Sequence, residues 1–171
     1  MCGIAGIVAL RGVQIEPGAL NRLMDAIAHR GPDGAGTWFN ADRSVALGHR
    51  RLAIIDPGEG GQQPMASADG RHVMVYNGEV YNFIELRREL EAMGAHFRSE
   101  SDTEVILAAW QAWGESMLLR FNGMWALAIF DTQLGELFLA RDRFGIKPLL
   151  YAATPERFVF ASEMRALMRS G

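Results

Sequence analysis

The sequence predicts an α+β fold in which antiparallel sheets and helices pack in layers. Segments with the apolar spacing of amphipathic helices occupy the first two thirds of the chain, together with short apolar runs. After residue 123, four short β-type segments follow one another and are joined by turns, which indicates an antiparallel meander. One of them, MWALAIF (124–130), is apolar on both faces. Such a strand must be covered on both sides, by a second sheet and by helices.

The first half of the chain begins with a strand, followed by a helix and two more strands. Residues 3–10 are apolar and rich in β-branched side chains, which predicts a buried strand. The next apolar residues recur at helical spacing, and we expect this helix to end at Gly31-Pro32. They are Leu20, Leu23, Met24, Ile27 and Ala28. Apolar runs at 45–47 and 73–76 predict strands on either side of the loop DPGEGGQQP.

Two further helices are predicted before the meander. One begins at Asn82 and closes at Gly94. The other starts with a capping box, Ser101 and Glu104, and runs to Gly114. The meander strands are expected at 124–130, 137–140, 149–153 and 157–161, with a closing helix at 162–169.

Composition and charge argue against several classes of protein. The 171 residues are 49% hydrophobic and 22% charged, which suits one globular domain with a sizeable core. The net charge of −3 carries no long block of either sign, so we expect no nucleic-acid partner. No segment approaches the roughly 20 apolar residues of a bilayer span, and the N-terminus lacks the basic region of a signal peptide. With a single cysteine, we expect a cytoplasmic protein that does not act at a membrane.

Cys2 is the first candidate for chemistry. Methionine is removed from a chain when the next side chain is small, and Cys2 would then carry both a thiol and a free α-amine. The amine, with a reference pKa of about 7.7–8, can serve as the base of an N-terminal nucleophile. The alternative is a buried, inert cysteine beside a strand. Gly3 and Gly6 favour the nucleophile, because they would leave little bulk around the sulfur.

Arg51, Asn77-Gly78 and Asp102 each have a functional and a structural interpretation. Arg51 follows a short strand; its guanidinium suits a carboxylate ligand, but a surface arginine has the same signature. Asn77-Gly78 is a strong hairpin-turn signal, or else an oxyanion hole made by the Asn77 amide and the Gly78 N–H. Asp102 lies in the first turn of a helix, where the helix dipole favours a carboxylate without any ligand.

The remaining motif searches predict no metal and no cofactor in this domain. The four histidines (29, 49, 72 and 96) have no metal-ligand spacing. No phosphate-binding glycine loop or serine-nucleophile elbow occurs, and GEGG (58–61) is interpreted as a flexible loop.

Several motifs in a fixed order are far more specific together than singly. They are MCGIAG, HRGPDG (29–34), GHRRLAIID (48–56), YNGEVYN (76–82), SESDTEVIL (99–107), RFNGMWALAIFD (120–131), ARDRFGIKPLLY (140–151) and FASEMRAL (160–167). With them the chain resembles, over essentially its whole length, the N-terminal glutaminase domain of glutamine-dependent asparagine synthetases. These are class II glutamine amidotransferases of the N-terminal nucleophile hydrolases. HRGPD and RDRFGIKPL favour this branch over amidophosphoribosyltransferases and glucosamine-phosphate synthases.

The resemblance implies a four-layer αββα sandwich that hydrolyses L-glutamine to L-glutamate and ammonia through a thioester on Cys2. It makes the Cys2 amine the base, and Asn77 and Gly78 the oxyanion hole. It places the glutamine α-carboxylate on Arg51 and the α-ammonium on Glu79 and Asp102. The implied substrate-binding residues are Arg51, Leu52, Ala53, Ile54, Ile55, Asn77, Gly78, Glu79 and Asp102. The loop at 57–64 is interpreted as a lid over bound glutamine.

The resemblance also implies a partner domain. Such synthetases continue into an ATP-dependent synthetase domain with an SGGxDS-type loop, and residues 1–171 contain no such loop. We therefore expect one amidotransferase domain over 1–171, with ATP and Mg needed only in the synthetase domain and the ammonia used to make asparagine from aspartate. Three alternatives stay open. They are a non-catalytic glutamine-sensing module, an amidotransferase half that serves another acceptor, and a different N-terminal nucleophile hydrolase.

Overall fold

The chain folds into strands and helices that follow the predicted order. The strands are β1 (Gly3–Ala9), β2 (Gly34–Phe39), β3 (Val45–Arg51), β4 (Met65–Ala66), β5 (His72–Val80), β6 (Gly123–Asp131), β7 (Glu136–Arg141), β8 (Leu150–Ala153) and β9 (Arg157–Ala161). The α-helices are α1 (Pro17–Ala26), α2 (Phe83–Ala92), α3 (Asp102–Trp113) and α4 (Met164–Leu167). Short 3-10 helices are η1 (Ala28–Arg30), η2 (Glu59–Gly61) and η3 (Gly114–Leu119). The computed structural model describes residues 1–53 and 58–170.

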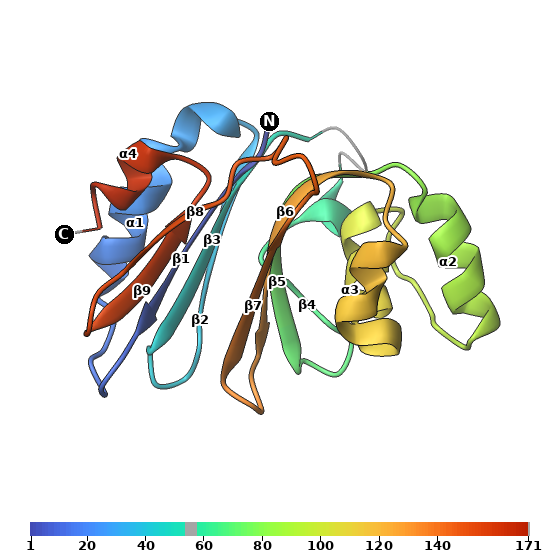
Figure 1. Cartoon of the computed structure of the whole chain (residues 1–171), viewed down its shortest axis with the longest axis horizontal. Coiled ribbons are helices and arrows are strands. Elements are labelled where there is room, and N and C mark those ends of the chain that lie inside the picture. Colours follow the sequence, from blue (N-terminus) through green and yellow to red (C-terminus); the bar gives the residue numbers. More distant parts are fainter. Residues whose placement is uncertain (54–57, 171) are drawn as a thin grey trace.

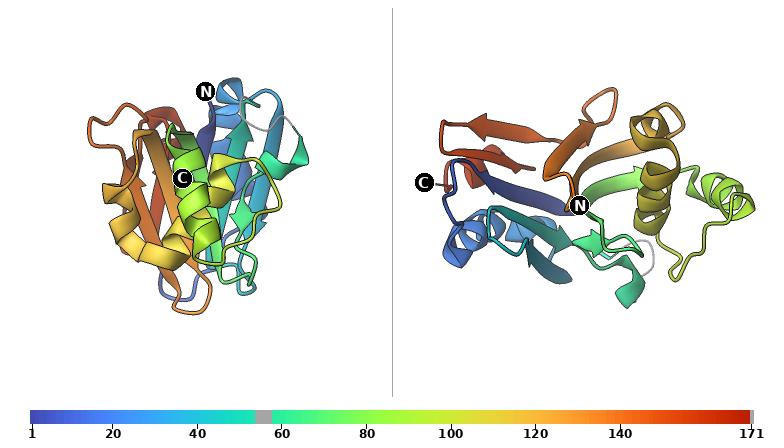
Figure 2. Two further views of the ribbon diagram at one scale, coloured as in Figure 1. Left: turned by 90° about the vertical axis from the view of Figure 1, so that its right-hand side faces the viewer. Right: turned by 90° about the horizontal axis from the view of Figure 1, so that it is seen from below.

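Two antiparallel sheets pack face to face, with helices on both outer sides (Figure 1). In the first sheet the strand order is β2-β3-β1-β9-β8, and in the second it is β4-β5-β6-β7. α1 and α4 cover the outer face of the first sheet, and α3 packs on the second with α2 beside it (Figures 1 and 2). The predicted α+β layering is confirmed. The predicted four-strand meander is wrong, because β6 and β7 pair in the second sheet whereas β8 and β9 pair in the first.

β6 shows why the layers form. Alternate residues of a strand face opposite sides of its sheet. One set packs against the helices, and comprises Trp125, Leu127 and Ile129. The other set packs between the two sheets, and comprises Ala126, Ala128 and Phe130. The two apolar faces of this segment are therefore both buried, as its sequence predicts.

β1 lies in the middle of the first sheet, paired on one side with β3 and on the other with β9. Its register sets Gly3 opposite Arg50, so the chain start emerges beside the end of β3. The expectation that Gly3 and Gly6 open space around the sulfur is wrong. A Cβ on Gly6 would lie 2.2 Å from the Phe160 ring, and one on Gly3 would lie 3.0 Å from Ile27. Both glycines instead allow close packing.

The hairpin interpretation of Asn77-Gly78 is also wrong. Both residues lie inside β5, which pairs with β6 from His72–Asp131 to Val80–Gly123. A Cβ on Gly78 would lie 2.3 Å from the carbonyl oxygen of Met124. The glycine therefore permits the close approach of two strands, and the pair is free to serve another purpose.

Helix ends differ from the predictions in detail. The first helix ends at Ala26 and is followed by η1, and the closing helix is shorter than predicted. Ser101 caps α3, its Oγ accepting from the N–H of Thr103 at 3.1 Å. Glu104 does not complete the capping box, because its carboxylate accepts instead from the N–H groups of Arg98 and Ser99. β2 and β4 were not predicted; β2 (GAGTWF) carries two glycines and β4 has only two residues.

A buried carboxylate organises the loop between β7 and β8. Asp142, 5% exposed, accepts hydrogen bonds from the N–H groups of Trp125, Phe144, Ile146 and Lys147. Burial acts to raise the pKa of Asp142, but these four bonds outweigh it and the pKa is lowered. The loop is thereby fixed against β6.

We expect Asp142→Asn to lower the free energy of unfolding by about 1.5–3 kcal/mol, because its NH₂ would face N–H donors. Chemical denaturation at neutral pH measures this difference. A lowered pKa stabilises the fold above the ordinary aspartate pKa and loses that effect as the pH falls. The deficit of the variant should therefore shrink below about pH 4. The exposed Glu136→Gln should change stability by less than about 0.5 kcal/mol. Equal stability of Asp142→Asn and the unaltered chain would contradict this account.

Candidate active site

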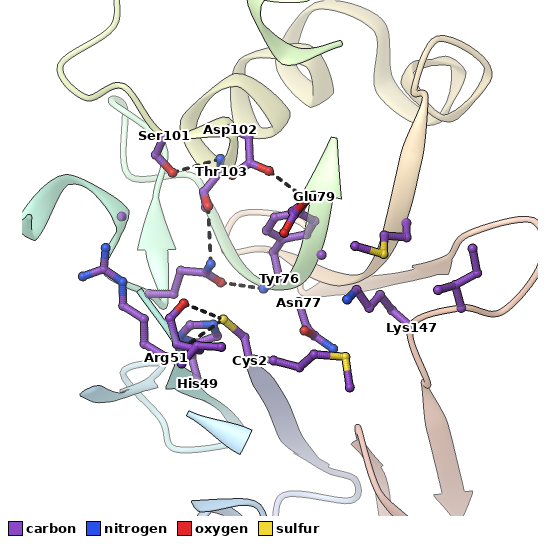
Figure 3. Close-up of a pocket in the computed structure, with 17 residues that line it drawn as sticks. Cys2, His49, Arg51, Tyr76, Asn77, Glu79, Ser101, Asp102, Thr103 and Lys147 are labelled. Carbon is purple, nitrogen blue, oxygen red and sulfur yellow. Dashed lines mark hydrogen bonds between the residues drawn. The ribbon is translucent and has the colours of Figure 1, made fainter. Parts of the chain in front are cut away.

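A cavity of about 410 Å³ lies at the edge of the sandwich where β1 begins and where β3 and β5 end (Figure 3). It brings together residues that are far apart in the sequence. The residues that line it are Met1, Cys2, His49, Arg51, Leu52, Gly61, Gln63, Tyr76, Asn77, Gly78, Glu79, Ser101, Asp102, Thr103, Met124, Ile146 and Lys147. Of the residues predicted as the site, Cys2, Arg51, Leu52, Asn77, Gly78, Glu79 and Asp102 all lie on it.

Cys2 is held at the cavity wall by its main chain and by its sulfur. The N–H of Leu52 donates to Sγ at 3.3 Å, and the thiol faces the Leu52 carbonyl oxygen at 3.5 Å. The carbonyl oxygen of Cys2 accepts from Nε of Arg30 at 2.8 Å. Met1 precedes it, lines the same cavity and is 57% exposed. The sulfur is thus half-buried but faces an accessible space.

Arg51, the last residue of β3, reaches the loop that follows. Its Nη1 donates to the carbonyl oxygen of Gly58 at 2.8 Å. Further along this loop, Gly61 and Gln63 line the cavity. The predicted lid therefore borders the cavity through Gly61 and Gln63, while its first residue, Pro57, lies outside the described residues.

The main chain after Arg51 is only partly described. Leu52 lines the cavity, whereas the N–H of Ala53 donates to Asp33 at 2.9 Å and Ala53 is not among the lining residues. Ile54 and Ile55 lie outside the described residues. The assignment of these four residues to glutamine stays a prediction.

Asn77 carries a side-chain donor with no partner in the described part of the chain. The residue is 1% exposed, and its Nδ2 is buried without a hydrogen bond. The side chain lies on the cavity wall beside Cys2 (Figure 3). Buried polar groups are almost always paired, so an orphaned donor at a cavity requires an explanation. An acceptor bound in the cavity would supply one.

The backbone of β5 directs a second donor the same way. Successive residues of a strand point their N–H groups to alternate sides. The N–H of Tyr76 points away from β6, to Gln63 at 2.6 Å, and that of Val80 points away from β6, to Asp102 at 3.2 Å. Gly78 lies between them in the alternation, so its N–H also points away from β6. Asn77 and Gly78 therefore present two donors at neighbouring positions.

Asp102 lies in the first turn of α3, 4% exposed. Its Oδ2 accepts from the Tyr76 hydroxyl at 2.9 Å and from the Val80 N–H. Burial raises the pKa of this carboxyl, although both hydrogen bonds act to lower it, and the negative charge of Glu79 raises it further. The ionised form is thus costly in the empty cavity, and a bound cation would stabilise it.

Several lining residues were not predicted from the sequence. Gln63 supports β5 through Tyr76 and contacts Thr103 with its other amide atom at 3.4 Å. His49 is 1% exposed, and burial, with a smaller effect of the Arg51 charge, lowers its pKa to about 4. It is therefore neutral at neutral pH. Lys147 is 6% exposed, and its side chain points into the cavity from the loop that Asp142 fixes (Figure 3).

Gln63, His49 and Lys147 carry little sequence signal. A glutamine in a loop, a histidine in a strand or a lysine before a proline has many structural uses. What assigns them to the cavity is strand pairing and loop closure between segments that are distant in the sequence. Only their places inside the ordered motifs, such as His49 in GHRRLAIID and Lys147 in ARDRFGIKPLLY, could have pointed to them.

The described part of the chain contains neither a metal-binding cluster nor a membrane-spanning helix. No group of three or more His, Cys, Asp and Glu side chains there is placed to hold a metal ion. No helix there is long and apolar enough to cross a membrane.

Comparisons with known proteins identify the family to which this chain belongs. The family model described as "Glutamine amidotransferase domain" matches residues 1–171. Asparagine synthetase [glutamine-hydrolyzing] 3 of Bacillus subtilis (strain 168) is 40% identical over 171 residues, which cover 98% of this chain and 27% of that protein. A putative asparagine synthetase [glutamine-hydrolyzing] 2 of Methanocaldococcus jannaschii is 39% identical, over 98% of this chain and 35% of its own length.

A solved structure gives the same fold. Glutamine phosphoribosylpyrophosphate amidotransferase from B. subtilis superposes with a TM-score of 0.83 at 25% identity, over 99% of this chain and 44% of that one. The match extends through both sheets. The chain thus spans between a quarter and a half of the length of each of these three proteins. The chain is related to the glutamine-hydrolysing asparagine synthetases, as its identity to these relatives shows. Because the family model matches residues 1–171, the chain belongs to the glutamine amidotransferase domain family.

Proposed function

We propose that this chain hydrolyses L-glutamine to L-glutamate and ammonia, with Cys2 as the nucleophile after removal of Met1. The observation that carries the proposal is the meeting of four kinds of group on one cavity. A thiol, an arginine, two carboxylates and a pair of donors at neighbouring positions surround the same space. Glutamine offers one partner to each of them.

The charged groups suit the head group of a free amino acid. Arg51 would hold the α-carboxylate, since a guanidinium pairs well with a planar carboxylate. Asp102 and Glu79 would hold the α-ammonium, which favours the ionised form of Asp102 that burial disfavours. A site with two such charged groups rejects analogues that lack either charge, because a buried group is then left unpaired.

The reaction follows from the groups at the other end of the cavity. The Cys2 α-amine takes the thiol proton, and sulfur forms a bond to the side-chain amide carbon of glutamine. The oxyanion so formed accepts from Nδ2 of Asn77, which has no partner among the described residues, and from the N–H of Gly78, which points away from β6. The carbon–nitrogen bond then breaks as the ammonium returns its proton to the leaving ammonia. Water hydrolyses the resulting thioester to glutamate and restores the thiol.

The neutral state of His49 supports the α-amine as the base. A histidine with a pKa of about 4 is a weak base near pH 7. The amine, with a reference pKa of about 7.7–8, is better matched. Met1 must leave for this amine to be free. Its side chain is 57% exposed and already borders the cavity, so its removal would place the amine at the cavity wall.

The destination of the ammonia is proposed from the relatives. The B. subtilis and M. jannaschii proteins are named as asparagine synthetases, and this chain spans 27% and 35% of their lengths. We propose that residues 1–171 form one amidotransferase domain that works with an ATP-dependent synthetase domain. The ammonia would convert aspartate to asparagine there, and ATP and Mg would be needed only in that domain.

The proposal is tested by glutamate release from a panel of amides. The substrates are glutamine, asparagine, and glutamine blocked at its α-amine or its α-carboxylate. Protein whose mass confirms loss of Met1 should hydrolyse glutamine alone, and Cys2→Ala should not. A non-catalytic glutamine-binding module would bind glutamine without releasing glutamate, and hydrolysis of both blocked substrates would indicate another N-terminal nucleophile hydrolase.

Asn77→Ala removes one of the two oxyanion donors. We expect kcat to fall by roughly 10²–10³, with a much smaller change in KM, because the donor acts on charge that develops during the reaction. Steady-state kinetics with glutamine measures the split. A change confined to KM would place Asn77 in substrate binding and refute its role at the oxyanion.

Asp102→Asn removes the proposed partner of the α-ammonium. We expect KM for glutamine to rise about tenfold or more, as for a lost hydrogen bond to a charged group. In the unaltered enzyme, KM should rise as the pH falls through the raised pKa of Asp102, since only the carboxylate binds the cation. This rise should be absent from the variant. Asp25→Asn, at a surface carboxylate that is 71% exposed, should match the unaltered enzyme. An unaltered KM in Asp102→Asn would move the ammonium site elsewhere.

A further inference from the structure

Cys2 is tied to a residue near the other end of the described chain through one buried arginine. Arg30, at the end of η1, is 9% exposed. Its Nε donates to the carbonyl oxygen of Cys2 at 2.8 Å, and its Nη1 donates to Oε1 of Glu163 at 3.0 Å. Glu163 directly precedes α4 and is 133 positions from Arg30. Neither residue lines the cavity, so neither has a part in the reaction proposed above.

The arginine is a buried cation that depends on this one carboxylate. Among the described residues, Glu163 is the one carboxylate that lies within ion-pair distance of Arg30. Two nitrogens of the guanidinium are occupied by Cys2 and Glu163, while Nη2 is buried without a partner there. Loss of one partner of a buried ion pair leaves an uncompensated charge, which is strongly destabilising for that group. Without Glu163, Arg30 would therefore move toward water and away from Cys2.

The path of the arginine past the chain start is equally constrained. A Cβ on Gly3 would lie 3.2 Å from Cδ of Arg30, so the arginine side chain runs along the bare face of this glycine. The guanidinium therefore reaches the Cys2 carbonyl from beneath the first peptide of β1. The motifs HRGPDG and FASEMRAL contribute Arg30 and Glu163, and no residue of either lines the cavity.

Glu163 has surplus positive charge around it. It accepts from Arg30, from His29 at 2.9 Å and from Arg165 at 2.7 Å. Burial acts to raise its pKa, but hydrogen bonds from Arg30, His29 and Arg165 outweigh burial and lower it. His29 and Arg165 have half-exposed side chains, 50% and 53%, whereas that of Arg30 is 8% exposed. The three contacts thus differ in burial, and Arg30 alone of the three leads to the nucleophile.

An N-terminal nucleophile needs such an anchor. Once Met1 is removed, Cys2 is a chain end, and chain ends are poorly ordered unless tied down. The Cα of Cys2 carries both the amine and the side chain, and its direction depends on the position of the Cys2 carbonyl, which Arg30 holds. A misplacement of about 1 Å at a reacting group can cost about 10²-fold in rate.

We propose that Glu163 is a positioning residue for the nucleophile, acting through Arg30 on the main chain of Cys2. It holds the guanidinium against the Cys2 carbonyl and thereby orients the free amine and the thiol for attack. This inference rests on the proposed function, because it assigns a task to the amine of Cys2. It also links the segment that enters α4 to the geometry of the site.

The kinetic test compares four variants with the unaltered enzyme, each shown by mass to lack Met1. Glu163→Ala should lower kcat for glutamine hydrolysis about tenfold or more, with KM within about twofold. Glu163→Gln keeps an acceptor oxygen and should fall between. His29→Gln and Arg165→Gln disturb Glu163 without touching Arg30, and should stay within about twofold of the unaltered enzyme. An unchanged kcat in Glu163→Ala, or an equal loss in the two controls, would overturn the proposal.

Hydrogen exchange gives a readout that does not require turnover. In Glu163→Ala and Glu163→Gln, the amides of residues 3–5 should exchange faster than in the unaltered chain, because the start of β1 is loosened. If exchange increases only at residues 164–167, Glu163 merely secures α4 and the proposal fails. The unaltered chain could release no glutamate while both Glu163 variants still exchange faster at residues 3–5. That result would refute the proposed hydrolysis and support the anchoring of Cys2 by Arg30 and Glu163.

Discussion

The proposed nucleophile, Cys2, lies next to the first residue of the chain, and a residue near a chain end is ordered only when contacts from elsewhere hold it. β1 lies between β3 and β9, so the residue before it emerges from the middle of a sheet rather than from a frayed edge. Leu52 holds the sulfur of Cys2 and Arg30 holds its carbonyl. The αββα sandwich can therefore be understood as a scaffold that makes a terminus rigid. Both sheets contribute, because the opposite wall of the cavity belongs to β5.

The alternation of one strand supplies much of the remaining site. Tyr76, Gly78 and Val80 direct their N–H groups to the same side of β5, and the first and last of these are bound by Gln63 and Asp102. The N–H of Gly78, between them, and Nδ2 of the neighbouring Asn77 are the two donors that we propose for the oxyanion. Asp102, which accepts from the Val80 N–H, also lines the cavity. The end of β5 and the start of α3 are therefore held together at the cavity wall. The hydrogen bonds that support β5 and the contacts that we propose for the substrate would thus share residues of a single network.

The sequence predicted the layers better than it predicted their details. The segment 124–130 is apolar on both faces and therefore must be covered on both sides. In the structure one face packs against helices and the other against the first sheet. Local signals failed where a distant partner decides the outcome. Asn77-Gly78 has the composition of a hairpin turn, yet pairing with β6 keeps it extended. Gly3 and Gly6 suggested an open site, yet Ile27, Arg30 and Phe160 fill that space. The sequence did not predict the roles of four residues, His49, Gln63, Lys147 and Arg30. Their roles depend on contacts between distant segments, which no short stretch of sequence contains. For His49, Lys147 and Arg30, only their positions inside the ordered motifs could have marked them as candidate site residues.

The central claim is that the base is the free amine of Cys2. The most direct measurement compares glutamine hydrolysis by two preparations with identical side chains. In one, Cys2 is the first residue; in the other, one uncleavable residue precedes it, and mass spectrometry verifies both. The account predicts glutamate release by the first and none by the second, with equal thermal stability. Equal rates in the two preparations would show that another group takes the thiol proton, and the account of this site would have to be abandoned.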